Sequence, residues 1–493
     1  MWGRLLEAGI LQLAYFILPE TGMTTKLPPS AVAGAEAPES LYEAHKKIHP
    51  KAVTGIFATW RWILVWFTQL LFYGLCWLPW NGRQAVLFDL VERKFYLFGL
   101  VFWPQDVFFL AVLLIISAYA LFLFTAVAGR LWCGYACPQT VYTEIFLWIE
   151  QKIEGDRNAR IKLDAAPMSG AKLTKRALKY GLWIVFAFWT GFTFVGYFTP
   201  MKELVQSAMT LSFGSWEWTW IILYSGLTYG FAGHLREQVC KYMCPYARFQ
   251  GVMFDPDTLV ITYDEERGEP RGTRKRSADH KALGLGECID CDQCVAVCPT
   301  GIDIRKGLQY ECIGCAACID VCDQVMDKMG YPRGLIRYST ENALVKHWGS
   351  REILGHVGRP RIIVYTLILG AITLAWVWGL ATKPALRVDV IRDRMTLARE
   401  VEGGLVENVF RLQVMNVSEQ EQRYSVSVSG LNGIALMGDP IIQLSSASNK
   451  NVMFQVRVPP ESAAKGSRTI YFDVTSLSDK DIAVHEKAIF LMP

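Results

Sequence analysis

Charged residues and histidine are both scarce in this 493-residue chain. Only 19% of the residues are Asp, Glu, Lys or Arg, and the formal net charge is +4. A nucleic-acid-binding protein needs a dense basic surface, so this balance argues against DNA or RNA as a partner. The 7 histidines include His234 and His356, near the ends of apolar segments. They form no paired set of the kind that would hold a haem inside a membrane.

The low charge is matched by a high apolar content, with 52% hydrophobic residues and 17 tryptophans. This composition predicts an integral membrane protein in contact with the lipid bilayer. Five segments are long and apolar enough to cross a bilayer, and Trp or Tyr lies near several of their ends. The segments are 60–80, 106–128, 181–198, 216–232 and 362–380.

Basic residues predict the orientation of these five segments. The loop from 129 to 180 carries nine Lys or Arg residues, whereas the loop between the third and fourth segments carries only Lys202. Cytoplasmic loops are enriched in Lys and Arg. The N-terminus is therefore predicted in the cytoplasm and the C-terminus in the periplasm, for a multi-pass protein of the bacterial inner membrane. The nine residues are Arg130, Lys152, Arg157, Arg160, Lys162, Lys172, Lys175, Arg176 and Lys179.

Eight of the 13 cysteines lie within "CIDCDQCVAVCPTGIDIRKGLQYECIGCAACIDVC", which starts at Cys288. They form two C-x2-C-x2-C-x3-C runs, the pattern of a two-cluster ferredoxin in which the fourth cysteine of each run serves the other cluster. Two [4Fe-4S] clusters are therefore predicted, whereas structural zinc favours separated C-x2-C pairs. Asp323 replaces only a turn-forming proline of the pattern. The predicted ligands are Cys288, Cys291, Cys294 and Cys322 for the first cluster, and Cys312, Cys315, Cys318 and Cys298 for the second.

Four further cysteines form an internal repeat. "GRLWCGYACPQT" and "REQVCKYMCPYA" each carry C-x3-C-P directly after a predicted span. At i and i+4 the two sulfurs of a motif would share one helical face, and pseudo-symmetric packing of the two halves would bring four thiols together. Such a set suits Cu(I), zinc or an iron–sulfur cluster, or could cycle through a disulfide; the alternative is four small buried apolar residues. The repeat contains Cys133, Cys137, Cys240 and Cys244, whereas the lone Cys76 is interpreted as structural.

The two ends of the chain differ from this core. In the predicted cytoplasmic tail, Met23 is an alternative translation start. Residues 5–18 are predicted to form an interfacial helix, and residues 24–40 a disordered tract. From about residue 386, alternating apolar and polar runs predict about seven strands of an immunoglobulin-like β-sandwich without cysteine. The expected fold is thus five transmembrane helices, a cytoplasmic two-cluster ferredoxin-like insert and a C-terminal sandwich. The predicted domains are the tail 1–59, the four-span core 60–254, the ferredoxin-like domain 255–350, the fifth span 351–384 and the periplasmic sandwich 385–493.

Taken together, these features resemble the cytochrome c oxidase accessory protein family CcoG, also called FixG or RdxA. The resemblance covers nearly the whole chain from about Met23, through "HKKIHPK", "RLWCGYACPQTVYTEIF", "CKYMCPYARFQ", the ferredoxin runs, the last span and the sandwich. It implies a role in the biogenesis of cbb3-type cytochrome oxidase through reduction of Cu(II) to Cu(I). As partners it implies a copper-exporting ATPase or copper chaperone, and oxidase subunits.

The expected function is electron transfer to copper as substrate, which would make the protein an oxidoreductase. A cytoplasmic donor would reduce the two clusters, and Cu(II) would be reduced at or near the four C-x3-C-P cysteines. Two alternatives stay open, a quinol-linked membrane electron-transfer subunit and a non-enzymatic assembly scaffold with redox-sensing clusters. The oligomeric state is also open, with a homodimer as one option.

Overall fold

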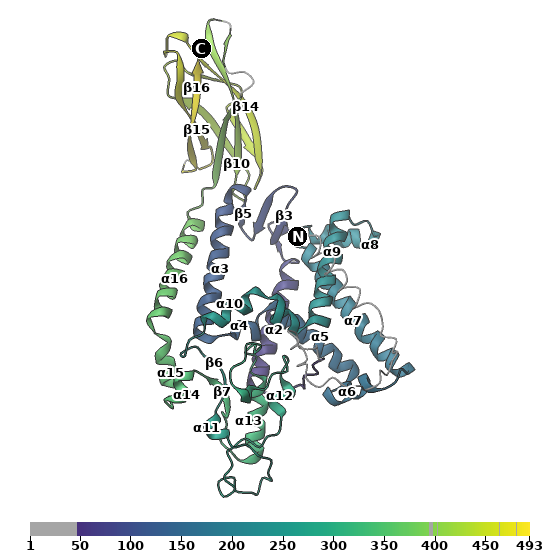
Figure 1. Cartoon of the computed structure of the whole chain (residues 1–493). Coiled ribbons are helices and arrows are strands. Elements are labelled where there is room, and N and C mark those ends of the chain that lie inside the picture. Colours follow the sequence, from purple (N-terminus) through teal and green to yellow (C-terminus); the bar gives the residue numbers. More distant parts are fainter. Residues whose placement is uncertain (1–46, 394–397, 402, 463, 480) are drawn as a thin grey trace, which may run out of the picture. The chain divides into compact units, whose positions relative to one another are not determined.

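The computed structural model describes residues 47–393, 398–401, 403–462, 464–479 and 481–493. The chain divides into two units, 1–47 and 48–493, and every element below belongs to the second. Figure 1 labels these elements along the chain. The segments at 5–18 and 24–40, for which an interfacial helix and a disordered tract were predicted, lie outside the described residues.

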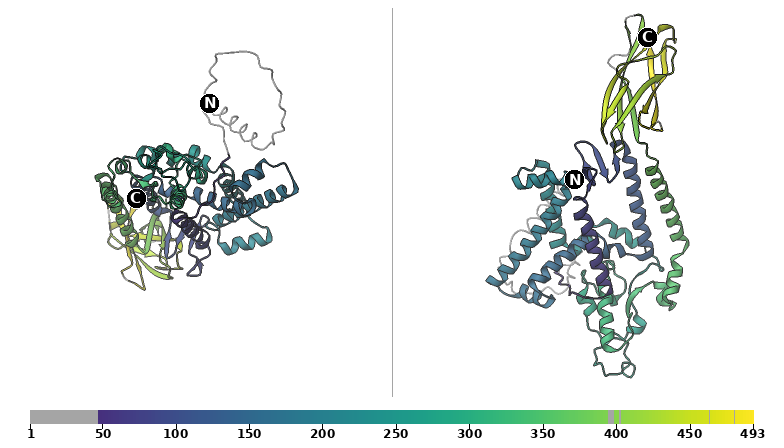
Figure 2. Two further views of the ribbon diagram at one scale, coloured as in Figure 1. Left: turned by 90° about the horizontal axis from the view of Figure 1, so that it is seen from below. Right: turned by 180° about the vertical axis from the view of Figure 1, so that it is seen from behind.

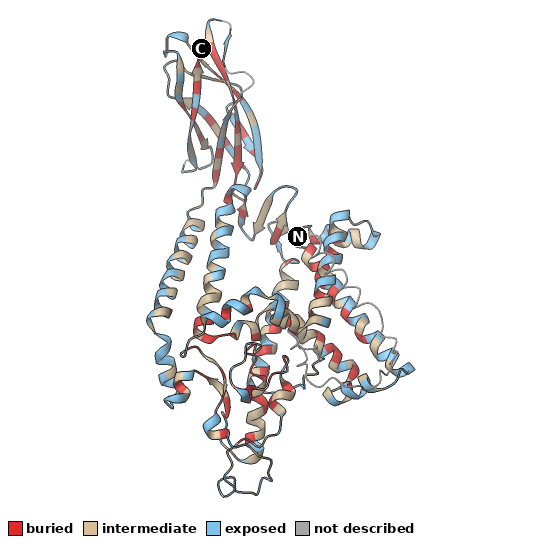
Figure 3. Ribbon diagram, viewed as in Figure 1, coloured by how far each residue is buried: buried red, intermediate tan, exposed pale blue. Residues whose placement is uncertain are grey.

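Three helices in the described residues are long and apolar enough to cross a membrane, at Pro104–Ala128, Gly170–Val195 and Pro360–Ala381. They comprise α3 (Val107–Ala128) with the short η1 (Pro104–Asp106) before it, α7 (Gly170–Val195) and α16 (Pro360–Ala381). α3 and α16 lie side by side in Figures 1 and 2, and Trp376 Nε1 donates a hydrogen bond to Phe109 O at 2.9 Å. Much of their apolar surface is exposed (Figure 3), as a lipid-facing surface requires.

These helices correspond to the second, third and fifth predicted segments and support association with a membrane. The third segment starts earlier than predicted, because α7 continues as a helix through basic residues that hydropathy excludes. They are Lys172, Lys175, Arg176 and Lys179.

The first and fourth predicted segments are helical, but among the described helices they do not meet the length and hydropathy of a span. α2 (Ile56–Leu75) has 20 residues and buries Arg61 and Gln69. α9 (Ser215–Thr228) has 14 residues and continues into η2 (Tyr229–Leu235), a π-helix. α8 (Met201–Thr210) joins α7 to α9. The buried polar side chains of α2 show that one of its faces packs against protein rather than lipid.

A buried network of charges joins α5 (Pro138–Glu154), α6 (Arg157–Ala165) and α7. Glu154 forms an ion pair with Lys179 Nζ at 2.9 Å, and Glu150 accepts from Arg236 Nη2 at 2.5 Å with Arg160 Nη1 3.8 Å away. Burial by itself would raise the pKa of Glu150, but the neighbouring guanidinium of Arg236 holds that pKa below its usual value. Three basic residues of the predicted loop, Arg160, Arg176 and Lys179, therefore belong to an internal ion network.

Replacement of Glu150 by glutamine should destabilise the protein, because Arg236 and Arg160 would stay buried with less counter-charge. We expect a loss of about 3–5 kcal/mol in the free energy of unfolding. Thermal and urea unfolding of the detergent-solubilised protein measure it. The matched control is Glu92→Gln, whose side chain is 64% exposed beside Lys94 at 3.5 Å. The control should lose under about 1 kcal/mol, and equal losses in both variants would contradict the network's role.

Residues between α2 and α3 form two small antiparallel sheets that hydropathy does not predict. Glu419 of the C-terminal domain accepts a hydrogen bond from Arg83 in one of them. Asp106, buried at the start of α3, pairs with Lys383 Nζ at 2.7 Å and Arg387 Nη2 at 2.8 Å. These contacts tie the ends of α3 and α16 to the C-terminal domain. The strands are β1 (Pro79–Trp80), β2 (Arg83–Gln84), β3 (Val86–Asp89), β4 (Lys94–Leu97) and β5 (Leu100–Phe102).

The cysteine-rich region is closed by two strands. β6 (Val260–Tyr263) pairs antiparallel with β7 (Ile336–Ser339). Between these strands, short helices surround a core that contains cysteine thiols together with apolar side chains such as Met326 and Leu335. The helices of this region and its exit are α11 (Glu265–Gly268), α12 (Gln293–Val297), η4 (Ile304–Lys306), α13 (Ala317–Met329), α14 (Glu341–Val345) and α15 (Ser350–Val357).

One carboxylate docks this region on α2. Asp320, buried on α13, accepts hydrogen bonds from the backbone N–H of Ala58 at 2.7 Å and of Phe57 at 3.2 Å. These are N–H groups of the first turn of α2, where the helix dipole is positive. Gly55 leaves room for the contact, because a Cβ there would lie 2.2 Å from the Asp320 carboxyl carbon.

The C-terminal domain consists of two antiparallel sheets with one shared core. One sheet has the order β12-β14-β10-β8 with β9 paired to β10, and the other β13-β11-β15-β16. The rings of Phe410 and Phe472 meet edge to face at 5.3 Å in the core. The described residues contain more strands than the seven expected, because β9 and β12 have three residues each and are too short to show alternation. The strands are β8 (Leu386–Arg392), β9 (Arg399–Val401), β10 (Leu405–Asn416), β11 (Gln422–Ser429), β12 (Ala435–Met437), β13 (Ile441–Leu444), β14 (Asn449–Val458), β15 (Gly466–Ser476) and β16 (Ala483–Met492), with η5 (Pro460–Ser462) after β14.

Candidate metal centres

The first thiol ring forms around a tight loop before α12. Asp290 and Asp292 adopt φ angles of 50° and 52° there, a left-handed conformation that Asp tolerates well. Cys322 on α13 lies close enough to the three loop cysteines to interact with them electrostatically. The fourth cysteine of the second run thus joins the first three of the first run. The ring contains Cys288, Cys291, Cys294 and Cys322.

One arginine fixes this loop. Arg305 donates to Asp290 at 2.7 Å, to Asp292 at 2.6 Å and to Asp303 at 2.8 Å. The hydrogen bonds from Arg305 hold the pKa of Asp303 below its usual value. Arg305 also acts electrostatically on Cys294. The loop is therefore held in shape beside a positive charge, which favours the anionic form of anything bound to the ring.

The second thiol ring follows the same plan at the start of α13. Gly314 and Ala316 adopt φ angles of 69° and 58°, which turn the loop around its centre. Cys298, held extended before Pro299, interacts electrostatically with the three loop cysteines. The ring contains Cys312, Cys315, Cys318 and Cys298. The structure therefore brings together both predicted sets, including the exchanged fourth cysteines.

The chemistry of both rings fits iron–sulfur clusters. All 13 cysteines are free thiols, so no disulfide occupies either ring. Burial raises the pKa of Cys312 and of Cys322 to about 12, so cluster binding must displace protons. Among the described residues no group of three or more His, Cys, Asp or Glu side chains is close enough to hold a single metal ion. A four-iron cluster needs a wider ring of thiolates than one ion does.

Substitution of Cys298 by serine should damage the cluster of the second ring and spare that of the first. We expect chemical iron to fall from about eight to about four atoms per chain. Iron and acid-labile sulfide analysis, with low-temperature EPR after dithionite, measures the loss. Cys76→Ser is the control, because this buried thiol donates to Tyr73 O at 3.4 Å within an apolar cluster that contains no ring cysteine, and its loss should leave iron unchanged. Loss confined to the first cluster would show that the fourth cysteines are not exchanged.

The second set of cysteines surrounds two helix starts. Pro138 opens α5 and Pro245 opens α10 (Pro245–Met253), and each directly follows a cysteine. The other cysteine of each motif lies on α4 (Leu131–Tyr135) or on η3 (Val239–Met243), another π-helix. π-Helical turns are rare and frequently occur at functional sites. We call this set the four-thiol site; it contains Cys133, Cys137, Cys240 and Cys244.

The two cysteines of a motif do not share one helical face, and this prediction was wrong. α4 ends at Tyr135, and Cys137 is extended with φ −63° and ψ 128°. Cys244 is likewise extended with φ −79° and ψ 111°. The residue before a proline is disfavoured in the helical region, so Pro138 and Pro245 break the helix between the sulfurs rather than after them.

The four thiols nevertheless converge. Cys240 lies close enough to Cys137, Cys133 and Cys244 to interact with them electrostatically, and Cys133 interacts with Cys137 and Cys244. Burial raises the pKa of Cys133 to about 11 and that of Cys240 to about 12. Cys133 and Cys240 are thus neutral thiols at neutral pH, from which a soft metal must displace protons.

Polar groups that the motif did not reveal complete the four-thiol site. Gln250 on α10 lies with Nε2 3.5 Å from Cys133 Sγ. Arg130 acts electrostatically on Cys133 and Cys240, and donates to Ala247 O at 2.8 Å. Neither residue is part of the C-x3-C-P pattern. Arg130 lies three residues before Cys133 in the quoted segment, so its position in the sequence could have indicated a role at this site.

The four-thiol site adjoins the second thiol ring. Cys133 and Cys240 pack against the cluster of buried side chains that contains Ile313 and Cys315. Gly134 allows this approach, because a Cβ there would lie 2.7 Å from the carbonyl oxygen of residue 314. The first motif, "CGYAC", has glycine at the position where the second, "CKYMC", has lysine. This difference in the sequence corresponds to the close contact at Gly134.

The two histidines considered as haem ligands are held by aromatic packing. The His234 ring lies 6.2 Å from Tyr180 and 6.1 Å from Trp183, between ring centroids. His356 stacks on Trp348 at 4.0 Å.

Comparison with known families adds to this geometry. Residues 235–341 match a family model described as "4Fe-4S dicluster domain", and 110–155 match one described as "4Fe-4S binding domain". Residues 376–493 match the model of an "IG-like fold at C-terminal of FixG". The first model spans both thiol rings. The only cysteines within the second are Cys133 and Cys137.

Three curated proteins are similar over most of the chain. Nitrogen fixation protein FixG of Rhizobium meliloti is 38% identical over 445 residues, 84% of this chain and 85% of that protein. Protein RdxB of Cereibacter sphaeroides is 37% identical over 467 residues, 92% of this chain and 97% of that protein. Protein RdxA of the same organism is 38% identical over 404 residues, 80% of this chain and 85% of that protein.

Proposed function

The chain belongs to the FixG family, and from that premise we propose that this iron–sulfur electron-transfer protein reduces Cu(II) to Cu(I) in support of cbb3-type cytochrome oxidase assembly. The observation that carries the proposal is the convergence of four thiols beside the second thiol ring. Soft thiolates prefer Cu(I) over Cu(II), so such a site stabilises the product of a one-electron reduction.

In this proposal the two rings hold the electron carriers, and the four-thiol site binds the copper ion. When bound, each [4Fe-4S] cluster carries one electron at a time. Arg305 beside the first ring and Arg130 beside the second each place positive charge near the thiols, which lowers the cost of adding an electron. Burial keeps water from the route between the rings and the four-thiol site. Gln250 orients Cys133 toward the substrate ion.

The five-span topology belongs to the same proposal. With α2 and with α9 plus η2 counted as spans, the basic loop before α7 and both thiol rings lie in the cytoplasm, and the sandwich lies in the periplasm. Electrons then come from a cytoplasmic donor or from the membrane. Cu(I) passes to an exporting ATPase or a chaperone, and the sandwich is available to oxidase subunits.

Reporter fusions test the topology. Fusions at Pro167, in the segment between α6 and α7, and at Gly272 should report the cytoplasm. Fusions after Lys383 and after Pro493 should report the periplasm. Pro167 is chosen because a fusion within α7 would break the helix. A cytoplasmic signal from the C-terminal fusion would mean an even number of spans and, because α16 separates the rings from the sandwich, would place the rings in the periplasm.

Serine substitutions test the copper site. Serine keeps the size of cysteine but removes the soft thiolate, so Cys137→Ser and Cys244→Ser should each abolish tight Cu(I) binding with the iron of the two rings unchanged. The double variant should lose no more than either single variant, because one lost thiolate already breaks a shared site. Anaerobic titration against a Cu(I) chelator, beside iron analysis, measures both quantities.

Two outcomes would overturn the copper site. Wild-type Cu(I) affinity in all three variants would remove these cysteines from copper chemistry. More than about eight irons per chain, with the excess lost in Cys137→Ser, would identify a further iron–sulfur cluster at the four-thiol site instead. The match of 110–155 to a 4Fe-4S model is the reason to make that measurement.

A further inference from the structure

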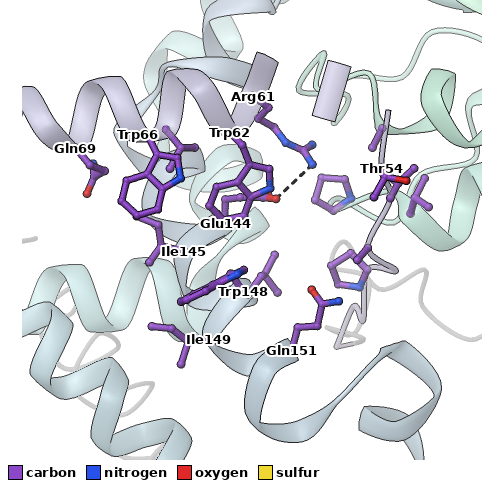
Figure 4. A pocket seen from close by; sticks show the side chains of 18 of the residues that line it. Thr54, Arg61, Trp62, Trp66, Gln69, Glu144, Ile145, Trp148, Ile149 and Gln151 are labelled. Carbon is purple, nitrogen blue, oxygen red and sulfur yellow. Dashed lines mark hydrogen bonds and ion pairs between the residues drawn. The ribbon is translucent and has the colours of Figure 1, made fainter. Parts of the chain in front are cut away.

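A cavity of about 890 Å³ lies between α2 and α5 and reaches the cysteine-rich region. Its walls are mainly apolar and aromatic, and Figure 4 shows the indoles of Trp62, Trp66 and Trp148 along it. Trp66, Leu70 and Trp148 line the cavity and are themselves exposed, so it opens at the surface between the two helices. A cavity of this size and lining suits a flat, largely apolar molecule.

The cavity has one polar end, and that end lies at the second thiol ring. Arg61 Nη2 and Glu144 Oε1 are 3.3 Å apart there (Figure 4). Arg61 is only 7% exposed, and its Nε has no hydrogen-bond partner among the described residues. Arg61 also acts electrostatically on Cys315 of the second ring. Val297 and Ala317, from the helices that carry ring cysteines, complete this end of the lining.

A second buried polar atom lies further along the cavity. Gln69 Oε1 has no hydrogen-bond partner in the described part of the chain, although the residue is buried. Figure 4 shows Gln69 on α2, two turns beyond Arg61. Buried polar atoms without partners are costly, and two of them along one cavity indicate a polar ligand that supplies the missing contacts.

We propose that this cavity binds the ring of a membrane quinone, with its apolar tail leaving between α2 and α5 into the lipid. A neutral ring with carbonyl or hydroxyl oxygens matches an end that offers both a donor, Arg61 Nε–H, and an acceptor, Glu144. The lining also contains Lys51 and Arg160, so an anionic lipid head group is the alternative occupant, and displacement by phosphatidylglycerol tests it below. A plain acyl chain would leave the unpartnered atoms of Arg61 and Gln69 unsatisfied.

The site gives the clusters an electron donor within the membrane. Oxidation of one quinol to quinone releases two electrons and two protons. When bound, the two clusters would accept one electron each. Glu144, with its side chain 20% exposed, is placed to take the protons from the hydroxyl groups and pass them to water. This step rests on the iron–sulfur part of the proposed function and not on its copper part.

Two tryptophan substitutions test the binding site. Leu70 lines the cavity and is 68% exposed, whereas Ile63 is on the same helix, is 49% exposed and does not line it. Leu70→Trp should raise the Kd for decylubiquinone by at least about tenfold, because the indole fills the opening. Ile63→Trp adds the same group outside the cavity and should leave the Kd unchanged. Isothermal titration into the detergent-solubilised holoprotein measures both.

A third variant separates binding from proton transfer. Glu144→Gln keeps an oxygen acceptor for Arg61 but cannot take a proton, so its reduction rate is compared with that of the wild type at saturating decylubiquinol. Bleaching of the cluster absorbance by decylubiquinol should slow by about 100-fold or more, whereas dithionite should still bleach it fully. Normal decylubiquinol rates in Glu144→Gln would remove this carboxylate from the reaction.

The remaining outcomes each decide the proposal. No decylubiquinone binding by the wild-type protein, or equal loss in Leu70→Trp and Ile63→Trp, would overturn it. Full displacement of decylubiquinone by an equal concentration of phosphatidylglycerol would show a lipid site instead. Cu(II) reduction by dithionite-reduced protein without quinol binding would leave the copper proposal standing and this one refuted.

Discussion

The carboxylate of Asp320 holds the iron–sulfur region against the start of α2. It satisfies two N–H groups at the start of α2 that the helix itself cannot pair, and it does so from a helix that carries ring cysteines. Contacts of this kind contribute about 0.5–2 kcal/mol each. Everything proposed for electron flow depends on this docking, because it places Arg61 beside the second ring and closes the polar end of the cavity.

The second thiol ring is the point at which the separate parts of the chain meet. Arg130 and Arg61 reach it from two different helical segments and act electrostatically on Cys312 and Cys315. Positive charge beside a cluster favours its reduced form and so raises its reduction potential. The two guanidinium groups therefore offset part of the cost that burial imposes on the more negative, reduced form of a bound cluster.

Local patterns in the sequence predicted much of the site, and long-range contacts account for most of what was missed. The eight ring cysteines follow from their spacing, because tight turns alone bring the three sulfurs of a run together. The sandwich follows from alternation along its longer strands. The ion network was missed because Glu150 and Arg236 are 86 positions apart, and charges in a loop suggest solvent. The helix break before Cys137 could have been read from Pro138, which restricts the residue before it.

Three glycines lie where α2, α3 and α4 meet the iron–sulfur region. At each of them there is no room for a side chain. A Cβ at Gly55 would meet Asp320, one at Gly134 the backbone at 314, and one at Gly129 the carbonyl oxygen of residue 259 at 3.1 Å. The two surfaces at this interface are therefore closely complementary in shape. The iron–sulfur region is therefore a fixed part of the protein rather than a detachable carrier. A free ferredoxin put in its place would not fit these close backbone contacts, and so could not dock in position for electron transfer.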